Sequence, residues 1–181
     1  MGRVEVICGS MFSGKTEELI RRLKRLKYAN QSFKVFKPEV DTRNKKNIIK
    51  SHSKIEIKAE TVTSAKKILD LSADVDVVGI DEAQFFSGDL IAVCNTLANR
   101  GTRVIVAGLD MDFSGKPFGP MPNLMAIAEE VTKVHAVCSE TGDPALYSYR
   151  KGKNDNVVLL GEKNEYEPLS RKAFILKMKN K

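Results

Sequence analysis

Apolar residues along the chain follow two periodicities. Short, mainly apolar runs that are typical of β-strands occupy residues 3–8, 33–37, 75–80 and 103–109. Apolar residues three and four positions apart predict helices at residues 15–28, 64–71 and 88–100. A repeated order of strand and helix is typical of proteins with a parallel sheet. The pattern therefore predicts an α/β fold with a mainly parallel sheet.

Two further elements complete this core. Pro120 and Pro122 suit the first turn of a helix that continues through Met125 and Ile127. Residues 131–138 are typical of another strand. We therefore predict a nucleotide-binding core domain of residues 1–137, once the glycine-rich segment described below is taken into account.

Two segments depart from this rhythm. Residues 41–61 have isoleucines alternating among many lysines, which predicts an exposed hairpin or loop. After Pro144, residues 146–150 and 156–160 are typical of two short strands joined by a polar turn. Residues 138–181 are therefore predicted to form a small C-terminal subdomain built on a β-hairpin.

Composition limits the class of protein. The chain has 181 residues and a formal net charge of +7, enough for one sizeable core and a small appendage. No apolar run approaches the roughly 18 residues of a membrane span, and no signal-peptide pattern is present, so we expect a cytoplasmic protein without membrane contact. The basic runs lack interleaved aromatic residues, which favours solvated faces over nucleic-acid binding.

One glycine-rich segment, between the first strand and the first helix, carries chemistry. It matches the pattern G-x-x-x-x-G-K-[ST] and comprises Gly9, Ser10, Met11, Phe12, Ser13, Gly14, Lys15 and Thr16. In this pattern backbone N–H groups face phosphate oxygens, the lysine reaches the β- and γ-phosphates, and the threonine hydroxyl ligates Mg²⁺. The segment predicts binding of a nucleotide polyphosphate at the N-terminus of a helix.

A pair of carboxylates follows the third predicted strand. Asp81 and Glu82 come directly after Val77-Val78-Gly79-Ile80. In phosphate-loop proteins an acid at this place holds Mg²⁺, directly or through water. A second acid beside it is a candidate base that removes a proton from an attacking hydroxyl or water. Together with the glycine-rich segment, the pair predicts phosphoryl-transfer chemistry.

Four motifs in a fixed order make the functional prediction more specific. Asp81-Glu82-Ala83-Gln84-Phe85-Phe86 resembles the D-E-x-Q-F-F signature of the thymidine kinase family, and Gly9 to Thr16 resembles its G-x-M-F-S-G-K-[ST] loop. Lys37-Pro38 with Asp41-Thr42-Arg43 resembles K-P-x-x-D-x-R, and residues 108–119 resemble G-L-D-x-x-F-x-x-x-P-F-G. The resemblance runs from residue 3 to about residue 166.

The resemblance implies transfer of the γ-phosphoryl group of ATP to the 5′-hydroxyl of thymidine, on a P-loop core similar to the RecA-like ATPase fold. Deoxyuridine is a second candidate acceptor. Glu82 matches the family's catalytic base, and Asp81 matches its magnesium-associated acid. Lys15 and Thr16 match phosphate and metal contacts, and Arg43 matches a basic residue near the transferred phosphate. Mg²⁺, with ATP as co-substrate, is the implied requirement.

The resemblance also implies a nucleoside pocket and a lid. Positions that match the family's thymine pocket are Met11, Phe85, Leu109, Phe113 and Phe118, and polar candidates near the sugar are Asp41 and Gln84. A lasso-like loop of the family closes over the base, and the matching residues are Ser148, Val157, Leu159, Gly161 and Tyr166. Feedback inhibition by dTTP and assembly into a homo-oligomer, as a tetramer, are further expectations.

The chain departs from the family at a metal site. Many members hold a structural zinc with two C-x-x-C or C-x-x-H pairs, but only Cys138 is retained here; Thr141, Ser170 and Ala173 occupy the other positions. One thiolate cannot complete a four-coordinate zinc site, so no structural zinc is expected. We expect apolar residues to hold the subdomain instead, among them Tyr147, Tyr149, Phe174, Ile175 and Leu176.

Two other functions are compatible with parts of the pattern. A nucleic-acid-associated ATPase would use Glu82 to activate water, and the net charge of +7 permits it. The ordered set of Phe85, Phe113 and Phe118 argues against it, because an ATPase has no need of a nucleoside slot. A nucleotide sensor that binds without transfer is supported only by the missing zinc ligands.

Overall fold

The computed structural model describes residues 2–41, 47–50, 56–152 and 165–180 of the chain. Its centre is a six-stranded sheet in the order β5-β2-β6-β7-β1-β8, in which every neighbouring pair is parallel. The strands are β1 (Arg3–Gly9), β2 (Phe33–Pro38), β5 (Glu60–Val62), β6 (Val77–Ile80), β7 (Arg103–Gly108) and β8 (Glu130–Val134). This confirms the predicted α/β fold with a parallel sheet.

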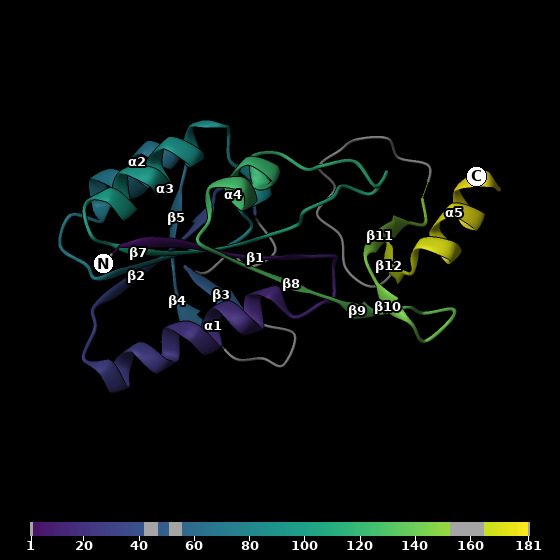
Figure 1. Cartoon of the computed structure of the whole chain (residues 1–181), viewed down its shortest axis with the longest axis horizontal. Coiled ribbons are helices and arrows are strands. Elements are labelled where there is room, and N and C mark those ends of the chain that lie inside the picture. Colours follow the sequence, from purple (N-terminus) through teal and green to yellow (C-terminus); the bar gives the residue numbers. More distant parts are fainter. Residues whose placement is uncertain (1, 42–46, 51–55, 153–164, 181) are drawn as a thin grey trace.

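Helices cover both faces of the sheet (Figure 1). One face carries α1 (Lys15–Leu26), followed by the short turn η1 (Lys27–Ala29), and the hairpin of β3 (Ile48–Lys50) with β4 (Glu56–Lys58). The other face carries α2 (Ala65–Leu71), α3 (Asp89–Asn99) and α4 (Met121–Ile127). The hairpin agrees with one of the two expectations for residues 41–61, although residues 42–46 and 51–55 lie outside the described part of the chain.

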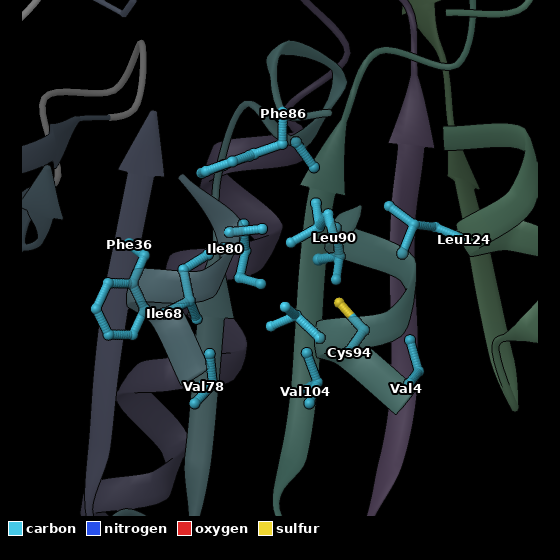
Figure 2. Close-up of a cluster of buried hydrophobic side chains, with 14 of the residues drawn as sticks. Val4, Phe36, Ile68, Val78, Ile80, Phe86, Leu90, Cys94, Val104 and Leu124 are labelled. Carbon is cyan, nitrogen blue, oxygen red and sulfur yellow. The ribbon is translucent and has the colours of Figure 1, made fainter. Parts of the chain in front are cut away.

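Each strand contributes to both layers of core because successive side chains point to opposite faces. Val4, Val6 and Cys8 of β1 pack under α3 and α4, and Figure 2 shows Val4 and Cys94 of α3 in this cluster. Ile7 faces α1 instead. Both faces of the central strands are therefore buried, as expected for a parallel sheet, and their carboxyl ends lie at one edge.

A smaller unit extends from β8. It contains β9 (Ala136–Val137), β10 (Pro144–Ala145), β11 (Tyr147–Arg150), β12 (Tyr166–Leu169) and α5 (Arg171–Lys179). The predicted strand 131–138 is thus broken at His135. Strand β11 pairs with β12 in an antiparallel register, and the predicted strand 156–160 lies outside the described residues. We refer to β9–β12 and α5 as the C-terminal unit.

The C-terminal unit has a core of its own. Tyr147 stacks on Phe174 of α5 with ring centroids 4.3 Å apart, and Tyr149 meets the same ring edge-on at 6.3 Å. Ser170 caps the N-terminus of α5, and its hydroxyl accepts a hydrogen bond from the Ala173 N–H. The prediction that Ile175 and Leu176 pack inside was wrong, because they lie on the outer face of α5 and are 46% and 54% exposed.

Candidate active site

The glycine-rich loop lies at the carboxyl end of β1, where the chain turns into α1. Gly9 has φ +146°, and a Cβ there would lie 2.1 Å from the Val134 carbonyl oxygen. Gly14 has φ +85° and caps the N-terminus of α1. Only glycine takes up such positions without strain or clash. The two glycines therefore let the loop turn back over the end of β1, with the helix dipole directed at its concave side.

Two side chains of the loop donate to a carbonyl of the same loop. Lys15 Nζ lies 2.7 Å from the Ser10 carbonyl oxygen, and Ser13 Oγ donates to the same oxygen at 2.7 Å. An ammonium and a hydroxyl are the donors that phosphate oxygens accept from in such loops. Both donors are thus held close together at the Ser10 carbonyl oxygen. From this position their hydrogen bonds can be transferred to the oxygens of a bound phosphate.

Thr16 and Asp81 meet across the loop. The Thr16 hydroxyl lies 3.1 Å from Asp81 Oδ2 and 3.3 Å from Oδ1, and Asp81 is buried at the end of β6. The Glu82 N–H also donates to Asp81 Oδ1, at 3.0 Å. A hydroxyl and a carboxylate are hard oxygen donors, and Mg²⁺ is typically bound by one or two such groups with phosphates and water. The donor set fits the predicted magnesium site.

Glu82 sits on a left-handed turn between β6 and the short helix η2 (Ala83–Phe85). Its backbone has φ +53° and ψ +39°, which is uncommon for a residue with a side chain. Its carboxylate accepts a hydrogen bond of 2.7 Å from Gln84 Nε2. The amide oxygen of Gln84 in turn accepts from the Leu109 N–H at 2.9 Å. The predicted base is therefore linked through one side chain to the loop after β7.

The loop after β7, residues 109–119, is stabilised by contacts between its own residues. Asp112 Oδ1 accepts from the N–H groups of Ser114 and Lys116, and Met111 forms an isolated bridge with Pro117. Phe118 meets Phe85 edge-on with ring centroids 5.8 Å apart. Four of the predicted nucleoside residues are therefore brought together on or against this loop, namely Phe85, Leu109, Phe113 and Phe118.

The C-terminal unit reaches this site from the other side. The Met11 N–H donates to Ser148 Oγ at 2.9 Å, and Ser10 Oγ donates to the Ala145 carbonyl oxygen at 3.1 Å. Ser10 thus ties the glycine-rich loop to β10. The Tyr166 hydroxyl accepts from Arg150 at 2.6 and 2.9 Å. Met11, Ser148 and Tyr166, predicted from distant parts of the sequence, are all near this junction.

The remaining predicted residues are placed less directly. Asp41 is buried beyond the carboxyl end of β2, with its carboxylate 3.9 Å from Lys37 Nζ. Arg43, Val157, Leu159 and Gly161 lie outside the described residues.

The structure also shows two features that the sequence analysis did not single out. Arg150 is 1% exposed and stacks on Phe113, with its guanidinium carbon 3.9 Å from the ring centroid. Asp110, in the loop after β7, forms a 2.7 Å ion pair with Lys133 of β8. Burial, with a smaller contribution from Asp110, raises the pKa of the Cys8 thiol to about 11, so Cys8 stays protonated. The burial of Arg150 could hardly be predicted from the sequence. The only signal is that Arg150 ends a tyrosine-rich strand, and sequence does not reveal whether a charged residue is buried.

The four positions that match zinc ligands in the family come together in the C-terminal unit. Thr141 Oγ1 lies 3.5 Å from Ser170 Oγ, which also accepts from the Ala173 N–H. Burial opposes ionisation of Cys138, but hydrogen bonds from Thr141, Ser170 and nearby backbone lower the pKa of its thiol to about 6. One thiol and two hydroxyls do not make a zinc site. Within the described ranges no group of three or more His, Cys, Asp or Glu side chains is placed to hold a metal.

Comparisons with known proteins find similar sequences that are named thymidine kinase. The thymidine kinase of Bacteroides thetaiotaomicron is 59% identical over 174 residues, covering 96% of this chain and 87% of that protein. The thymidine kinases of Porphyromonas gingivalis and Rhodothermus sp. are 57% and 52% identical, each over 96% of this chain and over 85% and 82% of their own lengths. A crystal structure of a DNA replication initiation factor aligns at a TM-score of 0.46 and 16% identity, covering 74% of this chain and 40% of that one.

A family model described as thymidine kinase matches residues 2–174. This match takes in the glycine-rich loop, the carboxylate pair, the loop after β7 and nearly all of the C-terminal unit. Among the described residues no helix is long and apolar enough to cross a membrane. From the extent of the family match and the identity of its relatives, the chain belongs to the thymidine kinase family.

Proposed function

We propose that the enzyme transfers the γ-phosphoryl group of ATP to the 5′-hydroxyl of thymidine, giving dTMP and ADP, with Glu82 as the base. The observation that carries the proposal is the joint placement of Thr16, Asp81 and Glu82. The first two are in contact, and the third follows Asp81 on a left-handed turn. Phosphoryl transfer depends mainly on positioning and charge neutralisation, and these groups supply both.

The triphosphate binds over the loop of residues 9–16. Lys15 moves its ammonium from the Ser10 carbonyl to the β- and γ-phosphate oxygens, which are stronger acceptors because they are charged. The N-terminus of α1 favours the same anion. Thr16 and Asp81 would hold Mg²⁺, which when bound neutralises charge on the phosphates. Arg43, matching the family's basic residue near the transferred phosphate, is proposed to assist there.

Glu82 accepts the proton of the 5′-hydroxyl as that oxygen attacks the γ-phosphorus. Its position directly after Asp81 keeps the base next to the phosphate-binding groups, while η2 fixes the chain that follows. A general base must reach the proton it removes within hydrogen-bond distance. The left-handed backbone at Glu82 is therefore attributed to this task, because strained residues persist where the surrounding structure holds them for function.

The nucleoside is proposed to lie between the 109–119 loop and the C-terminal unit. Phe85 and Phe118, whose rings meet edge-on, supply an apolar aromatic contact for a methylated base, and Leu109 and Phe113 extend it. The sugar side of this pocket is assigned to Asp41. Met11 is proposed to line the same pocket. The lasso-like loop expected from the family, matched here by Ser148, Val157, Leu159, Gly161 and Tyr166, is proposed to act as a lid over the base. Such a lid excludes water, which would otherwise compete for the phosphoryl group.

Further properties stay predictions. The family leads us to expect assembly into a homotetramer, inhibition by dTTP and acceptance of deoxyuridine. The cytoplasmic location is expected from the sequence pattern. Absence of structural zinc is proposed on other grounds, since the donor set around Cys138 does not fit the metal.

The test is ADP release from Mg-ATP with thymidine, deoxyuridine, deoxycytidine and single-stranded DNA supplied separately. We expect release with thymidine, with dTMP formed in equal amount, and no stimulation by DNA. Glu82→Gln should reduce kcat by about a thousandfold and leave ATP affinity unchanged. Glu39→Gln, an exposed acid beyond β2, is the control. Stimulation by DNA alone would favour the ATPase, and full activity of Glu82→Gln would remove Glu82 from its role.

A further inference from the structure

Gln84 uses both ends of its amide inside the protein. Its Nε2 donates to Glu82 Oε2 at 2.7 Å, and its Oε1 accepts from the Leu109 N–H at 2.9 Å. The side chain is buried, with an exposed fraction of 2%. Because a backbone N–H can only donate, the end of the amide facing Leu109 must be the oxygen. The nitrogen must then face Glu82, so the direction of the hydrogen bond to Glu82 is fixed by the backbone of the loop after β7.

Two glycines, one at the end of β7 and one at the end of the loop that follows it, make room for Gln84. A Cβ at Gly108 would lie 2.9 Å from Gln84 Oε1, and a Cβ at Gly119 would lie 2.3 Å from the Gln84 carbonyl oxygen. Gly119 also has φ +51°, which disfavours other residues. The side chain and the backbone of Gln84 are thus both packed against the loop that carries Phe113 and Phe118. This close fit leaves the amide little freedom to turn away from Glu82.

We propose that Gln84 is a positioning residue for Glu82, and not a contact of the sugar. This inference rests on the proposed role of Glu82 as base. A hydrogen bond from a neutral donor stabilises the charged carboxylate and fixes which oxygen is turned away from the donor. The bond from Gln84 Nε2 to Glu82 Oε2 thus holds the carboxylate of Glu82 in one orientation relative to the loop after β7. Because the same amide also bonds to Leu109, the position of Glu82 depends on the 109–119 loop. This loop is also the proposed binding surface for the nucleoside.

Two variants separate donation to Glu82 from support of the loop. Gln84→Met keeps the length of the side chain but can neither donate nor accept a strong hydrogen bond. Gln84→Glu keeps an oxygen for the Leu109 N–H but, when ionised, cannot donate to Glu82. We expect both variants to lower kcat by about tenfold to a hundredfold, with the ATP KM unchanged. If support of the loop were the only role, Gln84→Glu would retain normal kcat, and the inference would be overturned.

The decisive experiment is a double-mutant cycle of Glu82→Gln and Gln84→Met, with thymidine binding measured by calorimetry. If Gln84 acts through Glu82, adding Gln84→Met to Glu82→Gln changes kcat less than threefold, and the thymidine Kd stays constant throughout. A thymidine Kd that rises tenfold with Gln84→Met in both backgrounds would assign Gln84 to the nucleoside instead. Full activity of Glu82→Gln alone would defeat the proposed base, whereas normal kcat of Gln84→Met beside an inactive Glu82→Gln would defeat only this inference.

Discussion

The guanidinium carbon of Arg150 lies 3.9 Å from the ring centroid of Phe113. These residues belong to different units, Arg150 to β11 and Phe113 to the tip of the 109–119 loop. Arg150 also donates to the Tyr166 hydroxyl from Nε and Nη2. A planar guanidinium can stack and donate in its own plane at the same time, which an ammonium cannot do. Arg150 thus joins two proposed nucleoside residues, from the loop and from β12.

Arg150→Lys should weaken thymidine binding with little effect on ATP. The lysine keeps the charge but loses the stacking face and one of the two donors to Tyr166, so Phe113 and Tyr166 lose a shared support. We expect the thymidine KM to rise about tenfold, with the ATP KM unchanged, in steady-state assays. Arg100→Lys, an exposed arginine after α3, is the matched control. An equal rise of both KM values would instead indicate a general loss of structure.

Gly119→Ala should disrupt the contact between the 109–119 loop and Gln84. The new Cβ would lie 2.3 Å from a backbone oxygen, in addition to the strain of a left-handed backbone. Gly142→Ala provides a control for the strain alone, since Gly142 has φ +75° and no atom within 4 Å of the added Cβ. We expect Gly142→Ala to lower the free energy of unfolding by about 1 kcal/mol. Gly119→Ala should cost about 3 kcal/mol in urea unfolding; equal costs would contradict the proposed close fit.

Glu5 should stabilise the sheet in a way that depends on pH. Its carboxylate is buried on the α1 face and lies 2.7 Å from each of Arg3, Arg22 and Arg103. Burial opposes ionisation, but hydrogen bonds from Arg103, Arg3 and Arg22 lower the pKa of Glu5 from 4.5 to about 2. Because the folded pKa lies below the unfolded one, this stabilisation is present above about pH 4.5 and is lost as the pH falls towards 2.

Glu5→Gln should therefore lower the free energy of unfolding by about 3 kcal/mol at pH 7. The difference from the unmodified protein should shrink between pH 5 and pH 3, as measured by urea unfolding. Asp70→Asn, an exposed acid on α2, should change stability by less than about 0.5 kcal/mol at either pH. A difference for Glu5→Gln that is the same at pH 5 and pH 3 would exclude this ionisation as its source.

The C-terminal unit should depend on Phe174 and not on zinc. Phe174 stacks on Tyr147, and a Cβ at Gly115 would lie within 3.4 Å of both rings, so this aromatic pair supports the 109–119 loop. Phe174→Ala should cost about 3 kcal/mol and raise the thymidine KM, whereas the neighbouring exposed Ile175→Ala should cost less than about 0.5 kcal/mol. Elemental analysis should find no stoichiometric zinc, and a chelator should leave the Tm unchanged; a Tm lowered by chelator would refute the aromatic explanation.

The order of strands and helices, the glycine-rich loop and the carboxylate pair follow from local sequence. Gly9, Gly14, Lys15 and Thr16 lie within eight positions of one another, so the chemistry of that loop depends on neighbouring residues. The apolar runs of β6 and β7 are continuous because both faces of a parallel sheet are buried, and such runs can be recognised from the sequence alone.

The links between distant segments were decided only by the tertiary structure. Gln84 bonding to Leu109, Ser148 to Met11 and Arg150 to Phe113 each join residues at least 25 positions apart, and a hydrogen bond or stacked pair leaves no periodic trace in sequence. Helix α5 was missed because its apolar residues do not fall on one face, so Ile175 and Leu176 stay exposed. Sequence by itself thus determined which chemical groups the protein carries. Packing of the C-terminal unit and the 109–119 loop against the sheet decided how those groups are oriented, because burial and contact depend on the whole chain.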